Sequence, residues 1–248
     1  MRTRRQHGAP DQLKRRRRRL ALAGTALLLG CSLWSWAPAL LAAVLGWLQP
    51  DIAFRGPAGR RVVYVTIDDG PSEHTGDILA ALRRHGVPAT FFITGSHVAD
   101  AEALRRIVAE GHALGNHLWT TRRASALTLE EFRADFDATQ AVLRPVAPVR
   151  LFRPSSDFGT ADQLRYVREQ GLLPVMGTMY PLDHRLGRPA LLAGLARWLR
   201  IDGGILILHD GGTRGRTTAA VLDRLIPELK EDGCEFGRLD EALTATER

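Results

Sequence analysis

The chain has 248 residues, 45% of them hydrophobic and 25% charged, so it is long enough to bury a core without disulfide bonds. Its formal net charge of +7 comes from 34 Lys and Arg against 27 Asp and Glu. Nine of those bases and one of the acids precede residue 20, which leaves 25 bases and 26 acids in residues 51–248. Because this larger part has no basic excess to neutralise phosphates, we expect no nucleic-acid binding.

The first 50 residues have the pattern of a membrane anchor. Residues 1–19 end in the basic run Lys14 to Arg19, and no charged residue occurs from Leu20 to Pro50. About 20 apolar residues in a helix span a bilayer, and flanking Lys and Arg stay on the cytoplasmic side. We therefore predict a basic cytoplasmic tail (1–19), a transmembrane anchor (20–49) and a single-pass protein of the cell membrane with its catalytic domain extracytoplasmic.

Two other interpretations of this segment stay open. A signal peptide could be cleaved after Ala37-Pro38-Ala39, and the stretch that ends at Cys31 loosely resembles a lipoprotein attachment site. The apolar sequence continues to Leu48, past both positions, which favours an uncleaved anchor. The other cysteine, Cys234, has no partner in the exported part, and we predict that it is a small buried residue.

After a linker (50–61), residues 62–248 alternate short apolar runs with segments of helical periodicity. The predicted strands are Val62–Ile67, Thr90–Thr94, Ala113–Leu118, Arg150–Arg153, Leu173–Met179, Ile205–His209 and Glu235–Leu239. Predicted helices include Thr75–Arg84, Glu102–Glu110 and Thr217–Glu231, and capping boxes begin at Thr128 and Thr160. This alternation predicts an α/β fold, a distorted (β/α) barrel of about seven parallel strands.

Polar residues fall at the ends of these strands, where a barrel carries its active site. They are Asp68, Asp69, His117, Arg153, Asp183, His209 and Asp210. Two adjacent carboxylates at one strand end can serve as a general base and a metal ligand, which indicates hydrolytic chemistry. His112 lies five positions before His117, so the two would face opposite sides of one strand, and we expect His112 to have a packing role.

At these positions the chain resembles the polysaccharide deacetylase family, which includes nodulation-factor, chitin and peptidoglycan deacetylases. The resemblance covers about residues 60–241. The stretches that carry it are Thr66-Ile-Asp-Asp-Gly-Pro71, Ala89-Thr-Phe-Phe-Ile93, Gly111-His-Ala-Leu-Gly-Asn-His117, Phe152-Arg-Pro154, Pro181-Leu-Asp183 and Leu206-Ile-Leu-His-Asp210.

The resemblance implies a hydrolase that removes N-acetyl groups from an envelope or extracellular polysaccharide of the N-acetylglucosamine type, with a divalent metal that is usually zinc. It implies Asp69 and His117 as metal ligands, Asp68 as the general base and His209 as the general acid. Arg153 and Asp183 would hold that base and that acid in their charge states. Aromatic faces commonly stack on sugar rings, and Phe158 and Trp119 are the candidates here, although Trp119 also fits a core position.

The second motif departs from the family pattern. A second imidazole would follow His117 at residue 121, where this chain has Thr121, and a hydroxyl is a poor zinc ligand. Asp157, His184 and Asp210 are weak candidates to compensate. The alternative function is therefore a catalytically impaired carbohydrate-binding protein on the same fold, and a phosphoester hydrolase would need additional metal ligands that the sequence does not offer.

Overall fold

The computed structural model describes residues 37–57, 61–181, 183 and 188–246. The chain divides into two units, Met1–Leu40 and Leu41–Arg248. The predicted cytoplasmic tail and the larger part of the predicted anchor lie outside the described residues. The described part of the anchor is helical over residues 37–48. Within the described ranges, no helix is long and apolar enough to cross a membrane.

The second unit contains one parallel sheet, and each of the seven predicted strands is present in it. The strands are β1 (Val62–Gly70), β2 (Ala89–Ile93), β3 (Ala113–Asn116), β4 (Leu151–Phe152), β5 (Leu173–Pro174), β6 (Gly204–His209) and β7 (Glu235–Phe236). Their order is β5-β4-β3-β2-β1-β6, and β7 pairs with the start of β1. β1 is buried along its whole length, as expected for a strand with neighbours on both edges and helices outside.

The sheet curls into a half-barrel instead of closing. β5 and β6 are not neighbours in the sheet, but isolated bridges cross the gap between them: Ala53 to Val175, Arg55 to Gly204 and Met179 to Leu206. These bridges also explain why β5 is shorter than the predicted strand Leu173–Met179. The backbone pairs first with β4, then with Ala53 and finally with β6, so no single ladder extends along it.

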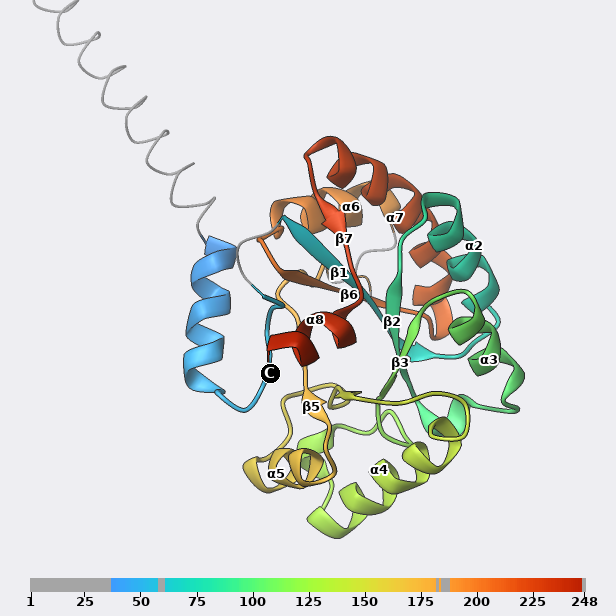
Figure 1. The fold of residues 1–248 in the computed structure, drawn as a ribbon, viewed down its shortest axis with the longest axis vertical. Coiled ribbons are helices and arrows are strands. Elements are labelled where there is room, and N and C mark those ends of the chain that lie inside the picture. Colours follow the sequence, from blue (N-terminus) through green and yellow to red (C-terminus); the bar gives the residue numbers. More distant parts are fainter. Residues whose placement is uncertain (1–36, 58–60, 182, 184–187, 247–248) are drawn as a thin grey trace, which may run out of the picture. The chain divides into compact units, whose positions relative to one another are not determined.

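Helices cover the outside of the curl (Figure 1). They are α2 (Thr75–His85), α3 (Glu102–Ala109), α4 (Leu129–Leu143), α5 (Ala161–Glu169), α6 (Pro189–Trp198) and α7 (Gly212–Glu231), whereas α8 (Leu239–Thr246) lies across one end. α7 packs against α2 and α6, and α4 and α5 lie next to β3 and β5. Both predicted capping boxes are confirmed, at Thr128 and Thr160, whereas α7 begins five residues before the predicted helix.

Two apolar clusters lie on the two faces of the sheet. The outer cluster joins β1, β2 and β6 to the helices and includes Cys234, which is buried as predicted. The inner cluster contains Tyr64, Phe92 and Ile205, and Leu239 and Leu243 of α8 pack against them. Because Leu239 and Leu243 reach this inner cluster, α8 covers the end of the curl where the strands begin. The opposite end, where the strands finish, carries the site described below.

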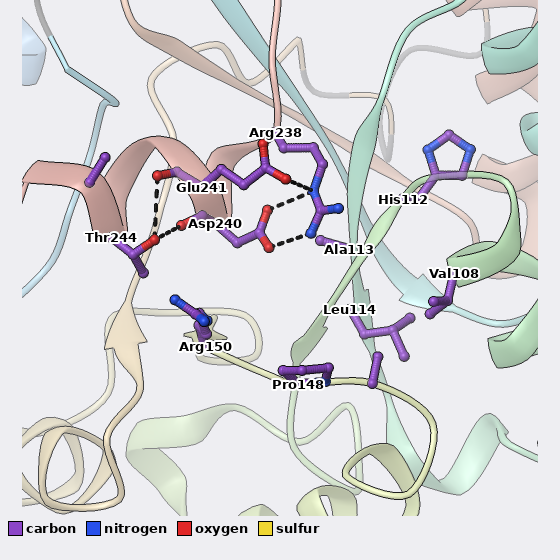
Figure 2. Close-up of a pocket in the computed structure, with 12 residues that line it drawn as sticks. Val108, His112, Ala113, Leu114, Pro148, Arg150, Arg238, Asp240, Glu241 and Thr244 are labelled. Carbon is purple, nitrogen blue, oxygen red and sulfur yellow. Dashed lines mark hydrogen bonds and ion pairs between the residues drawn. The ribbon is translucent and has the colours of Figure 1, made fainter.

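His112, at the start of β3, is buried, and its Nδ1 accepts a hydrogen bond of 3.1 Å from the amide of Ala89. This contact confirms the predicted packing role. Burial lowers the pKa of His112 to about 4. His112 lines a pocket at the N-terminal end of the strands, where Arg238 pairs with Asp240 and Glu241 (Figure 2).

The buried neutral imidazole makes stability depend on pH. Between pH 6.5 and 4 the unfolded chain binds a proton at His112 that the folded chain does not, so we expect stability to fall as the pH drops through this range. The loss from pH 6.5 to pH 5 should be about 2 kcal/mol. His112→Gln keeps an acceptor for Ala89 and should remove this part of the pH dependence, which denaturant unfolding at pH 5 and pH 7 measures. If the stability of His112→Gln depends on pH as that of the wild type does, His112 is not the source of this pH dependence.

Candidate active site

A bulge at the end of β1 brings the two adjacent carboxylates to one side. In a regular strand, neighbouring side chains point to opposite faces. Here the pairing with β2 shifts register between Asp68 and Gly70, and Asp69 adopts a left-handed conformation with φ of 65°. Both carboxylates are buried and line the same cleft. β1 thus extends three residues beyond the predicted strand, and the bulge is what turns both side chains into the cleft.

The cleft has a volume of about 630 Å³ and lies at the C-terminal ends of the strands. It contains most of the predicted site residues together with several that were not predicted. The lining residues are Leu45, Phe54, Asp68, Asp69, His117, Arg123, Arg153, Pro154, Ser155, Ser156, Phe158, Met176, Gly177, Tyr180, Ile207, His209 and Arg214. Residues from almost every strand therefore meet in one concave site of the size that suits a small ligand.

Asp68 is held by a buried arginine. Nη1 of Arg153 lies 2.6 Å from Oδ1 of Asp68 and 2.7 Å from the hydroxyl of Thr66. The guanidinium stacks over the ring of Phe92, 4.1 Å from its centroid. Burial lowers the pKa of Arg153, and the charge of Asp68 raises it again. This arrangement holds the Asp68 carboxylate at the cleft through a short, charge-assisted hydrogen bond from one fixed partner.

His209 is held by Asp183. Nδ1 of His209 lies 2.8 Å from Oδ1 of Asp183, and the amide of His209 donates a 2.9 Å hydrogen bond to Oδ2. This contact occupies Nδ1 and leaves Nε2 for a ligand in the cleft. Asp68 and His209 are paired residues of the adjacent strands β1 and β6. A carboxylate base and a carboxylate-supported imidazole therefore lie side by side, the arrangement that general acid–base chemistry needs.

Asp69 and His117 form the third pair. Oδ1 of Asp69 is 3.4 Å from Nε2 of His117, while Nδ1 of His117 bonds the carbonyl of Arg153 at 2.8 Å. Burial lowers the pKa of His117, but the charges of Asp68 and Asp69 together raise it above its ordinary value. Burial raises the pKa of Asp69, and the hydrogen bond and charge of His117, with His209 and Arg214, bring it well below its usual range.

This pair fits two of the ligands of a metal ion. Zinc ligands lie about 2.0–2.2 Å from the ion in a tetrahedron, which places neighbouring donor atoms about 3.4 Å apart. A ring nitrogen held by a backbone carbonyl, with the other nitrogen directed at a carboxylate, is also how ligating histidines are oriented. Among the described residues, however, no three His, Cys, Asp or Glu side chains are placed to hold a metal together.

The candidates to replace the missing ligand have other roles or lie outside the described residues. Thr121 is exposed. Asp157 accepts hydrogen bonds from the amides of Ser125 and Gly159, so it caps its own turn. Asp210 accepts hydrogen bonds from the hydroxyls of Ser72 and Thr75. His184 is not in the described ranges.

The two predicted aromatic contacts differ in position. Phe158 is exposed at the cleft and packs edge-on against Phe54, with ring centroids 5.9 Å apart. Trp119 lies over Gly95, where an added Cβ would be 2.4 Å from the indole ring, and it does not line the cleft. Stacking of a sugar on Phe158 stays a prediction, and the position of Trp119 agrees with the packing alternative.

Two polar residues of the cleft, Tyr180 and Arg214, were not among the predicted site residues. Burial and the charge of Asp183 raise the pKa of Tyr180 to about 12, so its phenol stays neutral beside His209. Arg214, near the start of α7, places Nη2 at 2.6 Å from Oδ2 of Asp69. The sequence contains no local signal for this ion pair, because its two members are 145 positions apart.

Together, the fold and the three pairs describe a hydrolase whose site lies at the C-terminal ends of the strands of a curled parallel sheet. The family model "polysaccharide deacetylase" matches residues 55–175. A chitooligosaccharide deacetylase from Rhizobium leguminosarum bv. trifolii is 34% identical over 190 residues, which are 70% of this chain and 87% of that protein. The chain belongs to the polysaccharide deacetylase family.

Solved structures agree with this assignment. A peptidoglycan N-acetylglucosamine deacetylase superimposes with a TM-score of 0.75 at 28% identity, over 80% of this chain and 96% of that one. A family 4 acetyl xylan esterase from Clostridium thermocellum, in complex with a cobalt ion, gives a TM-score of 0.69 at 30% identity, over 74% and 91% of the two chains. The resemblance seen in the sequence is therefore confirmed for the family and for its hydrolase class.

The buried pair of Arg153 and Asp68 should be strongly coupled. Arg153→Met leaves a buried carboxylate without its cation, and we expect a loss of about 3 kcal/mol or more in the free energy of unfolding. The double variant with Asp68→Asn should lose less free energy of unfolding than the sum of the two single variants, because removal of one partner already breaks the ion pair. Denaturant unfolding of the four proteins measures this coupling.

The exposed ion pair of Asp162 and Arg165 on α5, 2.9 Å apart, is the matched control. Its removal should change the free energy of unfolding by less than about 1 kcal/mol. Additive losses at Arg153 and Asp68 would show that the two side chains do not depend on each other.

Proposed function

We propose that the protein hydrolyses the N-acetyl group of an N-acetylglucosamine-type sugar in an envelope or extracellular polysaccharide. One observation carries this proposal: the Arg153–Asp68 pair, the Asp183–His209 pair and the Asp69–His117 pair all converge on one cleft. Amide hydrolysis needs a base for the attacking water, an acid for the leaving amine and a group that polarises the carbonyl. The three pairs match these three needs.

Asp68 is the proposed general base. Its partner Arg153 holds it in place by an ion pair, and Arg153 is itself fixed by Thr66 and by the Phe92 ring. A carboxylate that cannot rotate away is in position to take a proton from water that approaches the acetamide carbon. Its burial excludes competing solvent, which strengthens its interaction with that proton.

His209 is the proposed general acid. Asp183 accepts from Nδ1 and stabilises the positive charge that the imidazole carries when Nε2 holds a proton. Protonation from Nε2 lets the sugar nitrogen leave as a neutral amine. The phenol of Tyr180, whose ring centroid is 5.8 Å from that of His209, borders the space for this group.

Asp69 and His117 are the proposed ligands of a divalent metal, with zinc as the expected ion. When bound, such a metal polarises the carbonyl oxygen and acidifies the attacking water. The 3.4 Å separation of the two donor atoms and the orientation of His117 by the Arg153 carbonyl support this assignment. The exposed Thr121 supports weak metal binding. Weak metal binding is also expected for the alternative, a carbohydrate-binding protein without activity.

The proposed base gives the decisive test. Asp68→Asn keeps the shape of the side chain but removes its basicity, so acetate release should fall by about 100-fold or more. We would measure acetate released from N-acetylglucosamine oligomers and from peptidoglycan by the detergent-solubilised full chain, with zinc and with chelator. Asp162→Asn, an exposed carboxylate on α5, is the control and should release acetate normally.

Equal activity of Asp68→Asn and the wild type would remove Asp68 as the base. Binding of oligosaccharide that is unaffected by chelator, with no acetate released from any glycan, would instead favour the carbohydrate-binding alternative. Metal-dependent release would favour the deacetylase and begin to define its substrate.

We also propose that residues 20–49 anchor the protein in the cell membrane with the catalytic domain outside. The uncharged stretch behind a basic tail supports this topology. So does an apolar surface on the described helical residues, where Leu41, Val44, Trp47 and Leu48 are all exposed. Leu45, between them, contacts the cluster of Ile52, Phe54 and Leu164. A bilayer surface is the partner that suits such a face, because tryptophan favours the membrane interface.

Chemical labelling tests this topology. In a chain with Cys31 and Cys234 replaced by serine, Arg105→Cys on α3 should react with a membrane-impermeant maleimide added to spheroplasts. Gln6→Cys in the basic tail should react only after the membrane is opened. Protection of residue 105 in intact spheroplasts would overturn the proposed orientation.

A further inference from the structure

Arg214 holds the second oxygen of Asp69. Its Nη2 lies 2.6 Å from Oδ2, whereas Oδ1 of the same carboxylate faces His117 at 3.4 Å. The side chain of Arg214 is 32% exposed and lines the cleft. Among the described residues, Asp69 is the acidic side chain with which it pairs. One oxygen of Asp69 is therefore left for a metal, and the other is already bound to a fixed positive charge.

The two carboxylates of β1 are each paired with an arginine. Asp68 is neutralised by Arg153, and Asp69 is neutralised by Arg214. A site that holds two carboxylates and one arginine has a net negative charge that attracts a divalent cation. The second arginine cancels this charge, and at such short separations it would repel a bound cation.

The missing imidazole acts in the same direction. Thr121 is exposed and neutral, so it adds neither a good donor nor a negative charge. A metal here would depend on two protein ligands, one of which shares its carboxylate with an arginine. Arginine is well suited to this role because it stays protonated and forms strong hydrogen bonds to carboxylates.

We propose that Arg214 is a positioning residue that fixes Asp69 as a one-oxygen ligand and weakens the binding of a divalent metal by its charge. The inference rests on the proposed metal site and adds to it a residue that controls metal affinity. It makes the metal exchangeable, so that occupancy follows the metal concentration around the protein. Removing the charge should tighten metal binding, which is the opposite of what the loss of a merely structural contact would do.

The test is a direct zinc titration of the metal-free full chain in detergent, by calorimetry or by competition with a fluorescent chelator. We expect Arg214→Gln to bind zinc at least 10-fold more tightly than the wild type. Arg214→Lys keeps the charge and should stay close to the wild type. Arg216→Gln changes an exposed arginine two positions along α7 and should leave the affinity unchanged.

The opposite results are equally clear. An unchanged or weaker affinity of Arg214→Gln, in a protein whose thermal unfolding matches the wild type, would overturn the inference. So would tighter binding by Arg216→Gln to the same extent, because the effect would then come from net charge alone. Failure of both the wild type and Arg214→Gln to take up zinc would also overturn it.

The same samples separate this inference from the proposed function. Tighter zinc binding by Arg214→Gln, with no acetate released by any variant, would support the role of Arg214 and reject the deacetylase. Metal-dependent acetate release by the wild type, with equal zinc affinities in both proteins, would support the deacetylase and reject the role of Arg214.

Discussion

Two consecutive buried carboxylates set the conditions for the rest of this site. An unpaired buried carboxylate costs several kcal/mol, so Asp68 and Asp69 each need a cation. Arg153 comes from the end of β4, which is separated from β1 by β2 and β3. Its side chain crosses above Phe92 of β2 to reach Asp68. The curl of the sheet makes this reach possible, so the pairing of Arg153 with Asp68 depends on the geometry of the half-barrel.

Under the proposed function, the two imidazoles have different roles, as metal ligand and as proton donor. Nδ1 of each is occupied by a protein acceptor, which leaves Nε2 for the cleft. For His117 that acceptor is a neutral backbone carbonyl, whereas for His209 it is the carboxylate of Asp183. A neutral carbonyl orients the ring but stabilises the imidazolium less than a carboxylate does, which suits a ligand that binds through a lone pair. A carboxylate stabilises the imidazolium, which suits a proton donor.

The strands and the principal residues of the site could be predicted because their signals are local. Each strand is a short apolar run, and Asp68, His117 and His209 follow such runs directly. The bulge at Asp69 could not be predicted, since it depends on how β1 pairs with β2. The length of β5 depends on three different pairing partners in turn. Arg214 could not be predicted because its partner is remote in sequence, and only the tertiary fold brings the two side chains together.

Under the proposed function, base strength and metal affinity are controlled by different residues. Arg153 pairs with Asp68 from inside the sheet, where it is 1% exposed. Arg214 acts on Asp69 from α7 at the edge of the cleft, where it is partly hydrated. A change at residue 214 therefore reaches the metal pair without breaking the buried network of Arg153, Thr66 and Asp68. This separation allows metal affinity to change while the residues proposed for proton transfer stay in place.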